Sequence, residues 1–287
     1  MKVCIIGLGL LGGSFSLALK SARKEINVIG VDINPANKDT ALRLGIADRI
    51  ESFEEAVKKA DLVVLATPVN VITKQILPAL DQIKDKAILI DLGSTKEEVC
   101  RIADTHPKRQ QYVASHPIAG TENSGPEAAF GALMHHKTMI ICDKEKSDTK
   151  AIEFMESMYK SLDMRIAYMP SVEHDQHIAF VSHLSHITSF ALGATVLDKE
   201  KDEKSIFTMA GSGFSSTVRL AKSSPEMWAP IFTQNQKNIS VALEAYIAKL
   251  KQFKKILDSN DEPSSYNLMK EANDIRRVLS GISKNDS

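Results

Sequence analysis

Residues 2–14 read Lys2-Val-Cys-Ile-Ile-Gly-Leu-Gly-Leu-Leu-Gly-Gly-Ser14, a short apolar run that leads into glycines spaced as G-x-G-x-x-G. In this pattern Gly7 permits a tight turn from strand to helix, and Gly9 lets the backbone approach a pyrophosphate without an intervening Cβ. Gly12 lets the new helix lie close to the sheet, with its first N–H groups directed at the phosphates. The stretch therefore predicts a dinucleotide-binding strand, turn and helix.

An acidic residue follows where such a unit needs one. The apolar run 28–33 places Asp32 at the end of a second strand, about twenty residues after the glycines, where a carboxylate binds ribose hydroxyls. The same carboxylate repels the 2′-phosphate of NADP, and no Arg follows it directly. We therefore predict NAD as the cofactor, bound by Asp32 and by the turn residues Gly7, Leu8, Gly9, Leu10, Leu11 and Gly12.

The composition is that of a globular protein without a nucleic-acid footprint. The 287 residues carry 36 basic and 36 acidic side chains, so no excess of positive charge marks a nucleic-acid partner. The three cysteines are Cys4, Cys100 and Cys142, which are scattered and form no C-x-x-C pair. This pattern argues against a disulfide framework and fits a reducing cytoplasm.

Two apolar stretches could be mistaken for export or membrane segments. Residues 3–19 are punctuated by glycines at turn positions, which disfavours a signal peptide. Residues 178–197 include His183, His186 and several serines, which are costly in lipid, so a buried helix is expected there. We expect no membrane association.

The order of apolar runs predicts an α/β fold followed by helices. Continuous apolar runs alternate with helical patterns up to about residue 143, which is typical of a parallel sheet covered on both faces, and one more helix (150–162) and a short strand (164–168) follow. The later runs are 62–68, 87–93, 111–115, 138–142 and 164–168. Helices are expected from residue 171 onward, at 172–197, 203–222, 230–258 and 264–280. The prediction is a Rossmann-type domain at 1–170 and an all-α domain at 171–287, whose broad apolar helix faces suggest a homodimer.

A histidine is predicted at the edge of the sheet where such folds bind ligands. His116 follows one predicted strand, and Ser94 follows the strand before it, so both can reach the same crevice. A histidine beside nicotinamide can accept the proton of an alcohol as hydride leaves, with an acid limb near pH 6.5 if its pKa is unperturbed. The alternative is a loop histidine packed beside Pro117.

The helical half contains further candidate residues. The spacings His174-x-x-His177 and His183-x-x-His186 invite a metal interpretation. No adjacent Glu supplies a general base and a nicotinamide dehydrogenase needs no metal, so we expect pocket or interhelix polar contacts, with exposed histidines as the alternative. Arg219 suits bidentate binding of a carboxylate if it is buried, whereas a lone helical Arg is otherwise a surface residue.

Together these motifs resemble the prephenate/arogenate (cyclohexadienyl) dehydrogenases of tyrosine biosynthesis over nearly the whole chain. The matching segments are Gly7–Ser14, Ala66-Thr-Pro-Val69, Asp91-Leu-Gly-Ser-Thr-Lys96, His116-Pro-Ile-Ala-Gly-Thr-Glu-Asn-Ser-Gly125, His174-Asp175, Ser182-His-Leu-Ser-His186, Arg219 and Met227-Trp228.

The resemblance implies a role for each matched residue. His116 is similar to the catalytic histidine that hydrogen-bonds the ring hydroxyl of the substrate, and Ser94 to the serine that orients it and contacts nicotinamide. Arg219 is similar to the arginine that binds a substrate carboxylate. The resemblance further implies cofactor contacts from Thr67 and Pro68, and substrate contacts from Thr121, Glu122, His174, Asp175, His183 and His186.

The implied reaction is NAD-dependent oxidative decarboxylation of prephenate to 4-hydroxyphenylpyruvate. Arogenate is the nearest alternative substrate, and a β-hydroxyacid dehydrogenase or a catalytically silent NAD sensor are more distant alternatives. Pro230 departs from the family pattern and is expected to kink or restart its helix, which leaves the position of Trp228 open. From the length of 287 residues we expect neither a fused chorismate mutase nor a C-terminal ACT domain.

Overall fold

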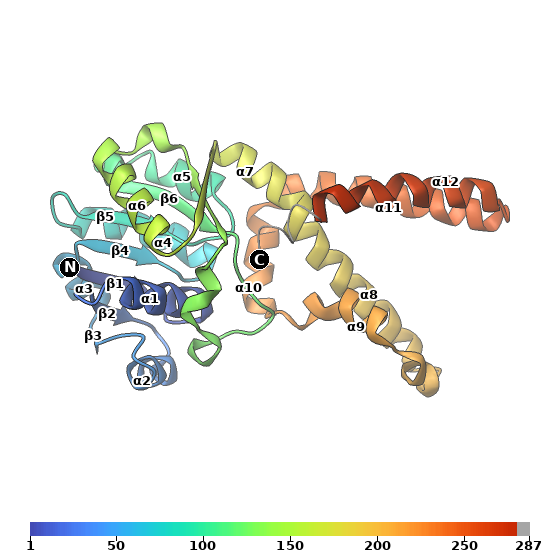
Figure 1. Cartoon of the computed structure of the whole chain (residues 1–287), viewed down its shortest axis with the longest axis horizontal. Coiled ribbons are helices and arrows are strands. Elements are labelled where there is room, and N and C mark those ends of the chain that lie inside the picture. The colour runs from blue at the N-terminus through green and yellow to red at the C-terminus, as the bar shows by residue number, and fades with distance from the viewer. Residues whose placement is uncertain (280–287) are drawn as a thin grey trace. The chain divides into compact units, whose positions relative to one another are not determined.

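The computed structural model describes residues 1–279 and contains an eight-stranded sheet of order β3-β2-β1-β4-β5-β6-β7-β8 (Figure 1). All seven expected strands are present, and the additional β3 has two residues, too few to give a periodic signal. The strands are β1 (Lys2–Ile6), β2 (Asn27–Val31), β3 (Arg49–Ile50), β4 (Leu62–Leu65), β5 (Ile88–Asp91), β6 (Tyr112–Pro117), β7 (Thr138–Cys142) and β8 (Arg165–Met169).

The sheet is parallel except at one pair, which corrects the expectation of a wholly parallel sheet. β7 runs antiparallel to β6, with Pro117 opposite Met139 and Ala114 opposite Cys142. Residues 118–137 form short 3₁₀ turns rather than a crossover helix, so β7 starts at the edge where β6 ends and must run back. β8 returns to a parallel arrangement with β7 after the intervening helix α6.

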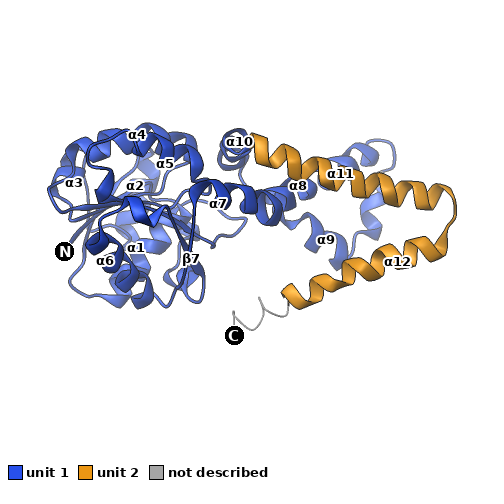
Figure 2. Cartoon of the chain, turned by 90° about the horizontal axis from the view of Figure 1, so that it is seen from above, with its two compact units in different colours: residues 1–235 blue, residues 236–287 orange. Residues whose placement is uncertain are grey.

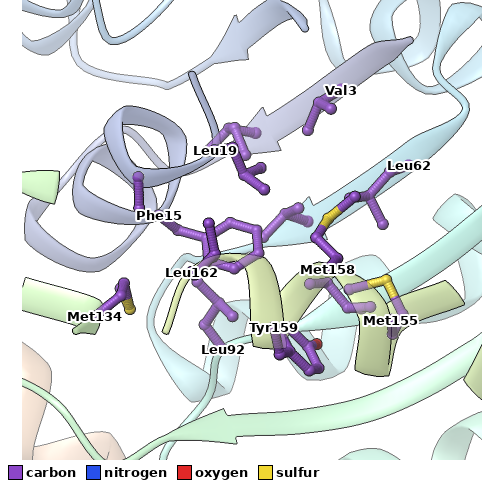
Figure 3. Packing of buried hydrophobic residues seen from close by; sticks show 14 of the residues in the cluster. Val3, Phe15, Leu19, Leu62, Leu92, Met134, Met155, Met158, Tyr159 and Leu162 are labelled. Carbon is purple, nitrogen blue, oxygen red and sulfur yellow. The ribbon is translucent and has the colours of Figure 1, made fainter. Parts of the chain in front are cut away.

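Helices cover both faces of the sheet, as the continuous apolar strands predict (Figures 1 and 2). Along β1, Val3 and Ile5 belong to one buried cluster, whereas Cys4 and Ile6 belong to the other. Figure 3 shows the first cluster, in which Phe15 lies near Tyr159. The helices of this half are α1 (Leu10–Ala22), α2 (Pro35–Arg43), α3 (Phe53–Lys59), α4 (Val69–Gln82), α5 (Glu97–Ala103) and α6 (Thr149–Ser161). Helices α1 and α6 contribute to the first cluster, and α3, α4 and α5 to the second.

From Ser171 to the end of the described residues the secondary structure is helical, so the expected α/β half and all-α half are both confirmed. A π-helical turn at Ala179–His183 joins α7 (Ser171–Ile178) to α8 (Leu184–Glu200). The expected single helix at 203–222 is wrong. Gly211 has an extended backbone just before α9 (Ser212–Val218), and the segment divides into 3₁₀ turns at Lys204–Met209 and Arg219–Lys222 on either side of that helix.

The stretch Ser171–Glu200 is long and apolar enough to cross a membrane by length and composition alone. The expectation of a buried helix is wrong for most of it, because Ser189 is the one residue of α8 that is buried within this chain. The amino-terminal part of the stretch Ser171–Glu200, in contrast, carries buried polar side chains that form hydrogen bonds with the α/β half, including His174 and Asp175. A polar anchor of that kind is typical of a helix that packs on protein.

The expected helix at 230–258 is divided at Asn235 into α10 (Pro225–Gln234) and α11 (Gln236–Asp258). Pro230 lies inside α10 without ending it. The carbonyl that Pro230 leaves without an intrahelical partner belongs to Glu226, in the exposed first turn, where water can bind it. Trp228 is therefore held in place and buried.

The described residues form two compact units, which divide after Asn235 (Figure 2). The second unit begins with α11 and continues through α12 (Glu262–Ala272) to a 3₁₀ turn at Asn273–Ile275. Asp261 caps α12 by accepting a hydrogen bond from the Ser264 amide at 3.0 Å. The last residue of the expected helix 264–280 lies outside the described residues, and the domain boundary at 170 stays a prediction.

Candidate active site

The glycine turn has the backbone geometry that the spacing predicts. Gly7 adopts φ +97°, and a Cβ there would lie 2.6 Å from the carbonyl oxygen of Ala66. A Cβ on Gly12 would overlap the Gly7 carbonyl, so both positions require glycine. At Gly9 a Cβ would meet no described atom within 4 Å, so this backbone faces open space at the start of α1. An anionic group can therefore approach the first N–H groups of the helix.

Asp32 is tied to the same turn. Its Oδ2 accepts a hydrogen bond from the Leu8 amide at 2.9 Å, and its Oδ1 accepts one from the Asn34 amide at 2.8 Å. The carboxylate at the end of β2 is thereby fixed beside the glycine turn, as the cofactor prediction requires.

A pocket of about 600 Å³ brings the cofactor and substrate candidates together. It lies in the first compact unit, between the carboxyl edge of the sheet and the helices that follow residue 171. The sequence-predicted residues that line it are Gly9, Leu10, Leu11, Thr67, Pro68, Ser94, His116, Thr121, His186 and Arg219. The sequence-predicted residues that lie outside its lining are Gly7, Leu8, Gly12, Asp32, Glu122, His174, Asp175 and His183.

His116 stands at the end of β6 and is held from behind by the helical half. Its Nδ1 lies 2.8 Å from Nε2 of His174, and Nδ1 of His174 lies 2.7 Å from Oδ1 of Asp175. The carboxylate of Asp175 also accepts hydrogen bonds from the backbone amides of Lys96 at 2.7 Å and Glu97 at 3.0 Å. A continuous chain of hydrogen bonds thus runs from the start of α5 to His116, and we call it the hydrogen-bond chain.

Burial controls the protonation of His116. The side chain is 7% exposed, and burial, reinforced by the neighbouring His174 and Lys96, holds the pKa of His116 well below its usual value. The imidazole is therefore neutral at neutral pH, as a proton acceptor must be.

Ser94 lines the pocket but makes no hydrogen bond to His116 within residues 1–279. The orienting contact expected from Ser94 is made by His174 instead. Sequence reasoning placed His174 and Asp175 in the pocket wall, whereas the structure places them behind His116. The adjacent pair His174-Asp175 was visible in the sequence, but its position behind β6 depends on how α7 packs, which no local pattern reveals.

The candidate histidines His183 and His186 pack against Trp228, whereas His177 is exposed and lies near Glu173. The ring of His186 stacks on the indole with centroids 3.5 Å apart, and His183 meets it edge-on at 5.9 Å. Burial lowers the pKa of His183 to about 4, and it also lowers the pKa of His186. Asn235 contacts Nδ1 of His183 at 3.2 Å and donates to the carbonyl of Asp175 at 2.7 Å. Within the described part of the chain, no group of three or more His, Cys, Asp or Glu side chains is placed to hold a metal ion.

Arg219 lines the pocket, but it is exposed, whereas the prediction of bidentate carboxylate binding assumed a buried Arg. Its Nη1 forms an ion pair with Glu122 at 2.8 Å, and its side chain is 52% exposed. Thr121 and Arg219 line the pocket, so an anion that enters can reach the guanidinium. The arrangement offers a neutral imidazole at the inner wall and a cation near solvent.

Comparison with known proteins identifies relatives over the whole chain. Residues 15–168 match the family model "Prephenate dehydrogenase, nucleotide-binding domain", and residues 170–271 match "Prephenate dehydrogenase, dimerization domain". The chain is 32% identical to the prephenate dehydrogenase of Bacillus subtilis (strain 168), over 96% of this chain and 76% of that protein. It is 30% identical to the cyclohexadienyl dehydrogenase of Zymomonas mobilis, over 96% of this chain and 95% of that protein.

Solved structures show the same similarity. Prephenate dehydrogenase from A. aeolicus in complex with hydroxyphenyl propionate and NAD+ superposes with a TM-score of 0.89 at 30% identity, covering 97% of this chain and 98% of that one. Synechocystis arogenate dehydrogenase superposes with a TM-score of 0.76 at 25% identity, covering 97% of this chain and 100% of that one.

Proposed function

The chain belongs to the prephenate dehydrogenase family, and from this premise we propose that it converts prephenate to 4-hydroxyphenylpyruvate with NAD, a step towards tyrosine. The observation that carries the proposal is the buried, neutral His116 in the wall of a pocket that also contains the glycine turn. A proton acceptor and a dinucleotide site that open into one cavity suit the oxidation of an alcohol.

NAD is the cofactor of this dehydrogenase, and the residues fit it. The backbone at Gly9 is open to a pyrophosphate, and Asp32 presents a carboxylate beside the same turn. We propose that Thr67, Pro68 and Ser94 contact the nicotinamide end, because they line the pocket next to His116. When bound, NAD supplies the acceptor for the hydride that leaves the hydroxyl-bearing ring carbon.

The chain's own residues handle the proton and the charges. His116 accepts the proton of the ring hydroxyl as the hydride departs, which gives a ring carbonyl linked through a conjugated C=C bond to the carbon that bears the carboxylate. Cleavage of the bond to CO₂ sends its electron pair through the ring to the oxygen, and His116 can return the proton there. Aromatisation makes this second stage strongly downhill.

Arg219 binds a carboxylate of the substrate in this proposal, with Thr121, Glu122 and His186 beside it. Because prephenate is a dianion, a fixed cation orients it as well as attracting it. The ion pair between Arg219 and Glu122 is half-exposed, and such pairs contribute little to stability, so a substrate carboxylate can replace Glu122.

The decisive experiment is to measure NADH formation with prephenate and with arogenate, each with NAD and with NADP. We expect turnover of prephenate with NAD. Preference for arogenate would support the alternative that the Synechocystis relative represents. NAD binding without turnover of either substrate would contradict the proposal and indicate a sensor.

We also propose a homodimer formed through the helical half. The match to a dimerization domain supports it, as do apolar side chains that are exposed in the single chain, among them Val181, Leu197, Leu250 and Leu257. Sedimentation of the full chain at micromolar concentration should give a dimer, and a fully active monomer would contradict it. The buried, unpaired cysteines fit a cytoplasmic location, with no membrane or nucleic-acid partner proposed.

A further inference from the structure

We propose that His174 and Asp175 are positioning residues that fix His116 in one tautomer, with the proton on Nδ1 and the lone pair of Nε2 facing the substrate. The inference rests on the proposed function, because it concerns the proton that the ring hydroxyl gives up. It assigns to His174 and Asp175 an action through His116 rather than contact with the substrate.

The direction of the hydrogen bonds follows from Asp175. An ionised carboxylate only accepts hydrogen bonds, and the backbone amides of Lys96 and Glu97 donate two of them. Nδ1 of His174, at 2.7 Å, must then carry a proton and donate the third. The proposal assigns the neutral form to His174, whose other ring nitrogen, Nε2, then holds a lone pair and accepts.

The same logic continues to the catalytic histidine. Because Nε2 of His174 accepts, Nδ1 of His116 at 2.8 Å must be the donor. The proton of neutral His116 is thus on Nδ1, and Nε2 holds a lone pair. Nε2 has no hydrogen-bond partner within residues 1–279, and it is not among the fully buried nitrogens, so it remains accessible from the pocket.

The support behind this chain is rigid. Asp175 is held at the start of α5 by two amides, and its own carbonyl accepts from Asn235 at 2.7 Å. His174 is 1% exposed and Asp175 is 2% exposed, so water does not compete for these bonds. When His116 takes up the proton, the buried carboxylate of Asp175 stabilises the resulting imidazolium through His174, the role that the aspartate has in a Ser-His-Asp triad. Lys96 and His183 also lie near, and the charge of Lys96 is paired with that of Asp91.

A matched pair of variants at His174 tests the inference. In His174→Gln the side-chain oxygen can still accept from Nδ1 of His116, whereas in His174→Met a side chain of similar size cannot. We expect kcat within about tenfold of the parent for the Gln variant and a loss of about 100-fold or more for the Met variant. The KM values for prephenate and NAD should change little in both, because His174 does not line the pocket. Equal kcat values for the two variants would overturn the inference.

A second variant removes the acceptor that sets the direction of the hydrogen bonds. In Asp175→Ala, Nδ1 of His174 has no carboxylate to donate to, so the proton of His174 is no longer held on Nδ1, and neither is that of His116. We expect kcat to fall by about 10-fold or more, with smaller changes in the KM values. Because Asp175 also accepts hydrogen bonds from the backbone amides at the start of α5, thermal unfolding must first show that the variant is folded. If it is not folded, the His174→Gln and His174→Met variants test the inference.

Nitrogen NMR of the histidine rings tests the tautomer without turnover. The His116 signals are assigned by their loss in His116→Asn, and the parent protein should show a protonated Nδ1 and an unprotonated Nε2 at neutral pH. The opposite tautomer in the parent would overturn the inference even if prephenate is the substrate. The expected tautomer in a protein that does not turn over prephenate would support the inference while the proposed function fails.

Discussion

The inner wall of the pocket and its mouth are built in opposite ways. At the inner wall, His116 is 7% exposed and is held by buried His174, which Asp175 holds in turn. At the mouth, Arg219 is 52% exposed and forms an ion pair with Glu122. The side chains of the inner wall are buried and joined by hydrogen bonds, whereas the ion pair at the mouth is exposed to solvent and can be exchanged for another contact.

The difference assigns separate tasks to the two ends. Fixed hydrogen bonds among buried side chains hold a reacting group at one place, which favours the chemical step. A solvated ion pair is screened and worth about 0–1 kcal/mol, so it can be exchanged for contact with an incoming anion. Changes at the inner wall should therefore act on kcat, and changes at the mouth on KM.

The largest effect is expected from His116→Asn. Loss of the general base should lower kcat by about 10²–10⁴-fold, with much smaller changes in the KM values. Steady-state kinetics with prephenate and NAD measures both. His177→Asn, at an exposed histidine on the same α7 helix as His174, is the control and should behave as the parent. Near-normal kcat in His116→Asn would show that the inner wall is not the catalytic end.

Arg219→Ala should act mainly on substrate binding. Loss of a charge-assisted contact costs about 1.5–3 kcal/mol, or about 10- to 100-fold in KM for prephenate, with a smaller change in kcat. The half-exposed position favours the lower end of that range. Arg101→Ala removes another exposed Arg, which is paired with Glu98 away from the pocket, and it should leave KM unchanged. An unchanged KM in Arg219→Ala would remove the guanidinium from the binding site.

Asp32→Ala should have a smaller effect, on the cofactor alone. Loss of the ribose contact should raise KM for NAD by about tenfold and reduce the preference for NAD over NADP. Because Asp32 also accepts from the Leu8 amide, Asp32→Asn serves as the control that keeps this acceptor and removes the charge. Equal kcat/KM for NAD and NADP in the parent would contradict the role given to the carboxylate.

The sequence predicts the parts of this site that depend on local pattern. The glycine turn, Asp32 at the end of β2 and His116 at the end of β6 follow from apolar runs, spacing and the rule that ligands bind at the carboxyl edge of a parallel sheet. The hydrogen-bond chain does not follow from any of these, because it joins β6, α7 and the start of α5 across the fold.

The helix break at Asn235 was missed for the same reason. The pattern across 230–258 is continuous, but the Asn235 side chain contacts the Asp175 carbonyl and His183 at the point where α10 ends. The exposure of Arg219 is likewise a property of the folded surface, since the 3₁₀ turn that carries it replaces an expected helix. At Asn235 a tertiary contact overrides the local preference for a continuous helix.

The smallest expected effect is in the pH dependence of kcat, which tests how strongly burial lowers the pKa of His116. An ordinary histidine has a pKa near 6.5, so half of the activity would be lost at about that pH. Burial, together with His174 and Lys96, lowers the pKa of His116 well below this value and extends its neutral form to lower pH. We therefore expect kcat to change by less than about twofold between about pH 8 and 6.5, and the acid limb to lie lower than an unperturbed histidine predicts.

Loss of activity through acid unfolding must be separated from the acid limb of kcat. The lowered pKa of His183 shows in which direction pH changes the folding stability. Its pKa is about 4 in the folded chain and about 6.5 when unfolded, so the unfolded chain binds the extra proton between these values. The stability that is present above about pH 6.5 is then lost progressively as pH falls towards 4. Circular dichroism at each pH identifies the range in which the protein is folded, and kcat is compared only there. A folded enzyme that loses half of its kcat by pH 6.5 would mean that water reaches His116, and the contrast between the inner wall and the mouth would fail.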